Sequence, residues 1–285
     1  MMQEFFSIMF LPLVACLILA GIYAYLGFHV IERQVIFVDL ALAQIAVLGA
    51  SCALILEHEL DSAFSYWLSL GFTMAGAAIF SLTRFKKQRV PQEAIIGIVY
   101  AVSAALLIIV LSRSGEGDEH IKQALVGNIL LVTLPEVIRI FIIGCVIGIL
   151  HFFFRHQFFM ISKSPDEAFN KGLNVRLWDF LFYITFGFVV TSSVKTAGVL
   201  LVFSFLVVPS VCAILFSDHM KTRLLLGWGV GFLASILGMG VSYYLDFPTG
   251  ASVVCVFGLI LILLSIFKEC LRCFVISRQV SFPPL

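Results

Sequence analysis

The sequence predicts an all-α integral membrane protein with eight or nine membrane-spanning helices. Hydrophobic residues make up 61% of the 285 positions and charged residues only 12%, about half of the roughly 25% charged residues that soluble domains carry. The mean hydropathy is +1.09. Apolar runs also recur at the length of about 20 residues that a helix needs to cross a bilayer. Lipid is therefore the expected surroundings of most of the chain, and the net charge of +1 gives no reason to expect a nucleic-acid partner.

Charges, prolines and glycines divide the chain into apolar segments, each of which predicts one spanning helix. Only helices and closed barrels satisfy every backbone group in lipid, and these runs lack the alternation of barrel strands. The first segment has no basic start and no small-residue cleavage site, so we expect it to be a retained span. The predicted spans lie near 6–28, 36–56, 63–83, 94–112, 134–154, 177–194, 197–217, 224–244 and 250–267.

The distribution of Lys and Arg predicts the orientation, because cytoplasmic loops are enriched in these residues. If the loop at 84–89, RFKKQR, is cytoplasmic, nine alternating spans place fourteen Lys and Arg inside and three outside. The C-terminus is then cytoplasmic and the outer loops are acidic. These loops either collect cations or simply hold the charges left when basic residues stay inside. Their candidate cation-collecting residues are Glu57, His58, Glu59, Asp61, Asp118, Glu119 and His120.

The chain shows no catalytic motif and is not expected to be an enzyme. It has no phosphate-binding loop and no nucleophile elbow. The segment at 57–61, EHELD, does not continue as a zinc-binding HExxH motif, because Ser62 stands where the second histidine would be. The seven cysteines lie mostly in apolar stretches and are expected to be small buried side chains rather than disulfides. No permanently bound cofactor is expected.

Two polar residues interrupt the second apolar segment, Asp39 and Gln44. A carboxylate in a span costs about 2.5 to 3.5 kcal/mol on insertion scales when it is central, so Asp39 is a candidate pathway residue. Alternatively, Asp39 caps its helix or pairs with Arg33. Gln44 can hydrogen-bond across a helix interface or offer its carbonyl oxygen to a cation. Four other polar residues near span ends are expected to snorkel or cap helices, namely Asn128, Arg139, Asp179 and Lys195.

A short surface helix is expected between the fifth and sixth spans, in the segment at 164–175, SPDEAFNKGLNV. Its residues follow the order of helix start and stop signals. Ser164 is the expected N-cap, Pro165 the first helical position, Asp166 and Glu167 the first turn, and Gly172 the stop.

Three stretches resemble a known family. They are IFVDLALAQIAVLGA at 36–50, QEAIIGIVYAVSAALLIIVLS followed by ALVGNILLVT within 92–133, and KTAGVLLVFSFLVVPSVCAIL with SYYLDFPTGAS within 195–252. Their order and content are similar to those of the zinc/manganese-type ABC importer permeases, and the resemblance runs over most of the chain.

The resemblance implies one transmembrane permease domain over residues 1–285, with a fold similar to that of the vitamin and siderophore ABC importers. It implies an inner-membrane permease that pairs with a second copy of itself and binds cytoplasmic subunits that hydrolyse ATP. The cargo would be a divalent metal, manganese, zinc or iron, received from an extracytoplasmic solute-binding protein. A non-metal small solute, or a secondary transporter that works without ATP, remains an alternative.

The resemblance also implies two cytoplasmic segments that contact the ATPase, at 164–175 and at 209–223. In the second segment a short amphipathic helix would dock in a groove of the ATPase. An ordinary helix terminus and a solvated connector are the alternatives for the two segments. The residues expected to take part are Pro209, Asp218, His219, Lys221 and Arg223 in one segment, and Asp166, Glu167 and Gly172 in the other.

The resemblance finally concerns the metal pathway. Related permeases usually carry an aspartate on the second helix and a histidine four residues later, so that both side chains share one helix face. With Gly49 as the anchor, Gln44 falls at the histidine and Leu40 at the aspartate, which leaves Asp39 one position earlier. Zinc favours imidazole and thiolate ligands, whereas manganese accepts oxygen ligands. The change of ligand type therefore leaves the metal open.

Overall fold

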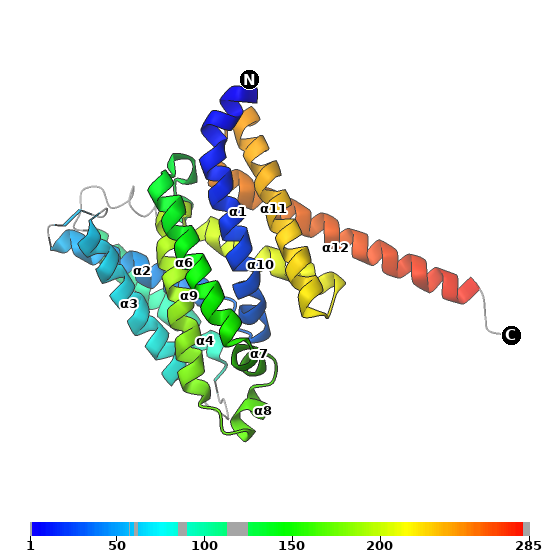
Figure 1. Cartoon of the computed structure of the whole chain (residues 1–285), viewed down its shortest axis with the longest axis horizontal. Coiled ribbons are helices and arrows are strands. Elements are labelled where there is room, and N and C mark those ends of the chain that lie inside the picture. The colour runs from blue at the N-terminus through cyan, green and yellow to red at the C-terminus, as the bar shows by residue number, and fades with distance from the viewer. Residues whose placement is uncertain (1, 57, 60–61, 85–89, 113–124, 282–285) are drawn as a thin grey trace.

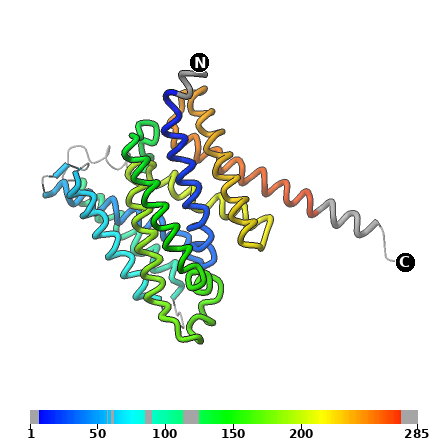
Figure 2. Tube along the Cα trace, viewed as in Figure 1, coloured from blue at the N-terminus to red at the C-terminus, as the bar shows by residue number. Residues whose placement is uncertain are grey.

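The chain folds into a bundle of long helices (Figures 1 and 2). The computed structural model describes residues 2–56, 58–59, 62–84, 90–112 and 125–281, and their side chains from 7 to 272. Nine helices in this part of the chain are long and apolar enough to cross a membrane, which confirms the prediction. They are α1 (Met2–Glu32), α2 (Val38–Ile55), α3 (Ala63–Leu82), α4 (Gln92–Leu111), α6 (Leu134–Phe153), α9 (Val175–Ala197), α10 (Val199–Phe216), α11 (Met220–Leu245) and α12 (Thr249–Ser281).

The helices form two neighbouring groups. In one group α2 packs on α3 and α4, and α3 packs on α9. In the other, α10 and α11 pack on each other and on both α1 and α12, and α12 extends away from the bundle toward the C-terminus (Figure 1). α1 and α10 also contact α6 and α9, respectively, so that a single apolar core joins the two groups.

The predicted short helix after the fifth span is confirmed as α8 (Pro165–Asn170), with Pro165 in its first turn and a positive φ of 75° at Gly172. Ser164 occupies the N-cap position, although its side chain accepts no capping hydrogen bond. Another short helix, α7 (Arg155–Lys163), connects α6 to α8. The end of the bundle where α8 lies is called the α8 end below.

The expectation of a separate short helix within 209–223 is wrong. Pro209 is buried inside α10, which continues to Phe216, and α11 already begins at Met220. The link between the two spanning helices is therefore only the three residues 217–219. α10 ends one residue before the predicted bound of 217, and α11 begins four residues before the predicted 224.

A tight backbone crossing holds the opposite end of the bundle together. The short 3-10 helix η1 (Ile129–Leu131) follows Gly127, which lies against Gly198 at the junction of α9 and α10. Both glycines have positive φ, and a Cβ at either would lie 2.2 or 2.3 Å from backbone atoms of the other segment. The amide of Asn128 donates to the carbonyl of Thr196 at 3.2 Å. Asn128 thus lies in this crossing rather than at a span end.

Candidate transport site

Asp39 lies in the first turn of α2 and is fully buried. Neither of its carboxylate oxygens has a hydrogen-bond partner in the described part of the chain. The two structural alternatives for Asp39 are therefore wrong: it caps no helix, and Arg33 pairs with another carboxylate. α2 is enclosed by α3, α4, α9 and α10. An unpartnered carboxylate among spanning helices is costly, which makes it the strongest candidate for a cation ligand.

Two buried hydroxyl groups also have no hydrogen-bond partner in the described part of the chain, and one of them, that of Tyr23, lies near Asp39. Tyr23 on α1 and Ser193 on α9 are both fully buried. The two hydroxyls are close neighbours, and the Tyr23 phenol lies within electrostatic range of Asp39. The helices α1, α2 and α9 thus each place a buried side-chain oxygen in the interior of the bundle.

Gln44 lies more than one turn further along α2 and is 8% exposed. A spacing of five residues rotates two side chains by about 140° around a helix with 3.6 residues per turn, so Asp39 and Gln44 do not share a face. Within the described residues Gln44 makes none of the hydrogen bonds across helices that would fix α2 to a neighbour. The structure therefore separates the two sequence candidates rather than joining them.

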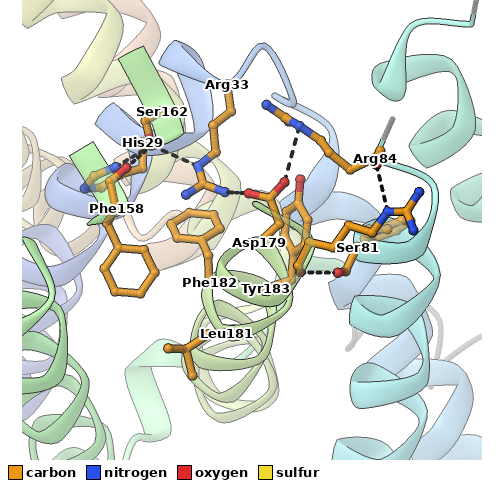
Figure 3. Close-up of polar contacts among 12 residues, drawn as sticks. His29, Arg33, Ser81, Arg84, Phe158, Ser162, Asp179, Leu181, Phe182 and Tyr183 are labelled. Atoms are coloured by element: carbon orange, nitrogen blue, oxygen red, sulfur yellow. Dashed lines mark hydrogen bonds and ion pairs between the residues drawn. The ribbon is translucent and has the colours of Figure 1, made fainter. Parts of the chain in front are cut away.

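A buried group of charges joins three helices at the α8 end, as Figure 3 shows. Arg33, which follows α1, and Asp179 on α9 form an ion pair in which both side chains have zero exposure. Arg84, which follows α3, places its Nε 3.2 Å from the other oxygen of Asp179, at an angle outside hydrogen-bond geometry. Burial lowers the pKa of the Arg33 guanidinium, while the carboxylate of Asp179 raises it. Two arginines thus share one carboxylate.

Two histidines extend this network into the bundle. His29 Nδ1 lies 2.8 Å from the hydroxyl of Ser162, which also accepts a hydrogen bond from Arg33 Nε at 2.9 Å. His151 Nε2 lies 2.9 Å from the Thr185 hydroxyl. The two imidazole rings are 6.4 Å apart between centroids. Together these contacts fix α1, α6, α7 and α9 relative to one another.

A polar cleft of about 430 Å³ opens beside the charge group at the α8 end. It brings together segments that are far apart in the sequence. Its lining includes Arg33 and Arg84 from the charge group, Lys163 from α7, and Asp166 from α8. The buried Nη2 of Arg33 has no hydrogen-bond partner among the described atoms. The cleft lining thus combines basic side chains with two carboxylates, those of Glu32 at the end of α1 and Asp166.

The residues expected to contact an ATPase fall into three places. Arg223 ties the link at 217–219 to the end of α1, because its Nη1 lies 2.6 Å from Glu32 and its Nη2 3.1 Å from Asp218. Pro209 lies apart, inside α10. In α8, Glu167 forms an exposed ion pair with Lys171 at 2.7 Å. The link at 217–219 and the helix α8 are both on the surface, whereas Pro209 is not.

The acidic outer loops are described only in part. His58 and Glu59 are exposed, and the ring of His58 lies 4.3 Å from that of Phe64. In the described ranges, no group of three or more His, Cys, Asp or Glu side chains is arranged to hold a metal. The other members of this set lie outside the described residues, namely Glu57, Asp61, Asp118, Glu119 and His120.

Sequence reasoning missed the role of Asp179, which it assigned to a span end as a capping or snorkelling group. A signal was present, because the predicted orientation puts Arg33, Arg84 and Asp179 at the same side of the membrane. Three spans that end on one side with two cations and one anion favour an ion pair between them. The histidines at 29 and 151 carried no such signal, since a lone imidazole in an apolar run has no predictable partner.

The comparisons with known proteins agree on one family. The model of the ABC 3 transport family matches residues 5–268. A manganese transport system membrane protein of Listeria innocua is 28% identical, over 68% of this chain and 71% of its own. A probable iron transport system membrane protein of Haemophilus influenzae is 26% identical, over 82% of this chain and 80% of its own.

Two solved structures have the same fold. PsaBC from Streptococcus pneumoniae, solved in complex with Fab, superposes with a TM-score of 0.76 and 21% identity over 93% of this chain and 95% of the matched chain. An inward-facing metal-chelate type ABC transporter gives a TM-score of 0.69 and 16% identity over 90% and 85% of the two chains. With its nine candidate spans and a family model that matches nearly its whole length, this multi-pass membrane protein belongs to the ABC 3 transport family.

Proposed function

We propose that the chain is the permease subunit of an ATP-driven importer that moves a divalent transition metal across the inner membrane. The observation that carries this proposal is the fully buried, unpartnered carboxylate of Asp39 in a chain of the ABC 3 transport family. Relatives named for manganese and for iron transport make these two metals the leading cargoes. Zinc and a non-metal solute rank behind them.

A divalent cation would satisfy the electrostatics around Asp39. A buried carboxylate without a partner costs several kcal/mol, and an arriving cation removes much of this cost. The hydroxyls of Tyr23 and Ser193, which also lack partners, offer further oxygen donors nearby. Oxygen ligands suit Mn²⁺ better than they suit a thiolate-preferring metal. Asp39 is therefore the proposed ligand of the passing metal, and Gln44 a lining group farther along α2.

The α8 end is the proposed cytoplasmic side. The basic residues Arg33, Arg84, Lys163 and Arg223 gather there, as the rule for cytoplasmic loops requires, and the C-terminus would lie on this side too. In this arrangement the charge group of Arg33, Asp179 and Arg84 closes the inner end of the pathway, because its net positive charge opposes the passage of a cation.

The proposed partners are a second copy of the permease, cytoplasmic ATPase subunits and an extracytoplasmic solute-binding protein. The ATPase would contact α8 and the link at 217–219, through exposed residues such as Asp166, Glu167, Asp218 and His219. ATP would bind and be hydrolysed on those subunits only. His58, Glu59 and the acidic outer loops would attract cations near the binding protein.

Uptake into proteoliposomes tests the proposal directly. The permease, reconstituted with its copurified ATPase and binding protein, is given Mn²⁺, Fe²⁺ or Zn²⁺ with and without ATP. We expect ATP-dependent accumulation of Mn²⁺ or Fe²⁺. An active ATPase without accumulation of any of these metals would refute the metal assignment, and uptake driven by an ion gradient without ATP would refute the importer class.

A further inference from the structure

A long apolar groove runs along the surface of the bundle between α1, α6 and α11. It has a volume of about 840 Å³. Its walls are aliphatic and aromatic, and three glycines, Gly21, Gly144 and Gly148, form part of its floor. A Cβ built on Gly21 or Gly148 would meet nothing within 4 Å. Gly148 therefore does not serve close packing between helices, and the space next to it is open.

The length of the groove matches one leaflet of a bilayer. On α6 the lining runs from Phe141 to Phe152, in the half of that helix nearer the α8 end. Eleven residues rise about 16 Å along a helix, close to half of the roughly 30 Å hydrocarbon thickness. A spanning helix of another protein would need a groove about twice as long, whereas a lipid acyl chain fits this length.

Two cations mark the end of the groove where a headgroup would lie. Arg155, at the start of α7, and Lys221, in the first turn of α11, both line the groove and are exposed. The groove lining contains no Asp or Glu, and neither cation forms an ion pair with a carboxylate in the described chain. The Arg155 guanidinium instead lies 4.7 Å from the centre of the Phe152 ring. An anion is therefore the missing partner.

We propose that this groove binds an anionic phospholipid, with an acyl chain over Gly144 and Gly148 and the phosphate between Arg155 and Lys221. Basic pockets between helices at a membrane face are suited to anionic headgroups. The bound lipid would border α7 and the start of α11, which adjoin the surfaces proposed above to contact the ATPase. Only this last consequence rests on the proposed function.

Trp228 provides the test, because it lines the groove and donates its indole N–H to the carbonyl of Gly21 at 2.9 Å. The full chain carrying Trp67→Phe and Trp178→Phe keeps Trp228 as its single tryptophan. It is reconstituted in zwitterionic vesicles containing a small fraction of phosphatidylglycerol with brominated acyl chains, and Trp228 quenching is recorded. Brominated phosphatidylcholine at the same fraction is the reference lipid.

We expect the anionic lipid to quench Trp228 at lower fractions than the zwitterionic lipid, by about fivefold in affinity for each basic residue. Arg155→Gln with Lys221→Gln should abolish this preference, while Lys268→Gln on α12, which removes a cation that does not line the groove, should retain it. Gly148→Leu should fill the groove and weaken quenching by both lipids.

Equal quenching by the two lipids, or equal effects of Lys268→Gln and the groove variants, would overturn the proposal. Protection of Trp228 from both lipids would also overturn it and would indicate a second copy of the chain in the groove. The measurement needs neither metal nor ATPase, so it can fail while the transport proposal stands.

Discussion

Arg33 and Asp179 form an ion pair with zero exposed side-chain surface, and this pair connects the end of α1 to the start of α9. The two residues are 146 positions apart in the sequence. Removing one partner of a buried pair leaves an uncompensated charge, which is far more costly than the net contribution of the intact pair. Arg84 increases the cost of removing Asp179, because a second cation depends on the same carboxylate.

We predict that Asp179→Asn destabilises the permease by about 3 to 5 kcal/mol, because it leaves two buried arginines without a counter-charge. Thermal unfolding in detergent, followed by the reactivity of buried cysteines such as Cys16, measures the change. Asp218→Asn is the control, since that carboxylate also pairs with an arginine but is 99% exposed. Equal unfolding curves for both variants would show that the buried pair has no special role.

The close contact between Gly127 and Gly198 at the other end of the bundle leads to a second prediction about stability. Gly127→Ala should cost about 1 to 2 kcal/mol for the left-handed backbone and a similar amount for the clash of its Cβ with the backbone at Ala197. Gly172→Ala separates these effects, because Gly172 has a similar φ but nothing within 4 Å of its Cβ. If both variants unfold at the same temperature, the close contact contributes nothing.

The sequence predicted the spans well because length and hydropathy are local properties. The short helix at Pro165 was equally predictable, since proline and acidic residues at its start are local signals. The pairing of Asp179 with Arg33 depends on which helices become neighbours, and this is decided by packing over the whole bundle. The same holds for the segment at 209–223, where the two spans leave only three residues between them.

The proposed ATPase contact on α8 is tested by reversing its charge. Asp166→Lys with Glu167→Lys should weaken the complex by about tenfold or more, since a like-charge contact easily costs the roughly 1.4 kcal/mol that this factor requires. Copurification of the ATPase and its activity at increasing subunit concentration measure the change. Lys268→Glu on α12 controls for a general change of surface charge. Unchanged assembly of the α8 variant would place the contact elsewhere.

Substitution of Asp39 should abolish transport without lowering the stability of the fold. Asp39→Asn keeps the side-chain shape but removes a buried, unpartnered carboxyl group, so the fold should be as stable as before or more stable. ATP-dependent metal uptake should nevertheless fall to the level seen without ATP. Ser51→Ala, at another buried position of α2, should leave uptake unchanged. Loss of folding together with uptake in Asp39→Asn would indicate a structural residue instead.

Gln44 should influence which metal passes, because an imidazole is a better ligand for zinc than an amide oxygen is. Gln44→His should therefore raise the uptake of Zn²⁺ relative to Mn²⁺ when the two compete. The histidine and Asp39 would still point about 140° apart, so the shift should be small in this variant.

Adding Leu40→Asp to Gln44→His places the aspartate four residues before the histidine, where both share one helix face. The shift toward zinc should then be larger than in the single variant. Leu40→Asn with Gln44→His is the matched control, because it adds a polar group without the charge. A ratio of Zn²⁺ to Mn²⁺ uptake that is the same in all three variants would mean that this face of α2 does not contact the metal. In that case the pathway would follow the face that carries Asp39, toward Tyr23 and Ser193.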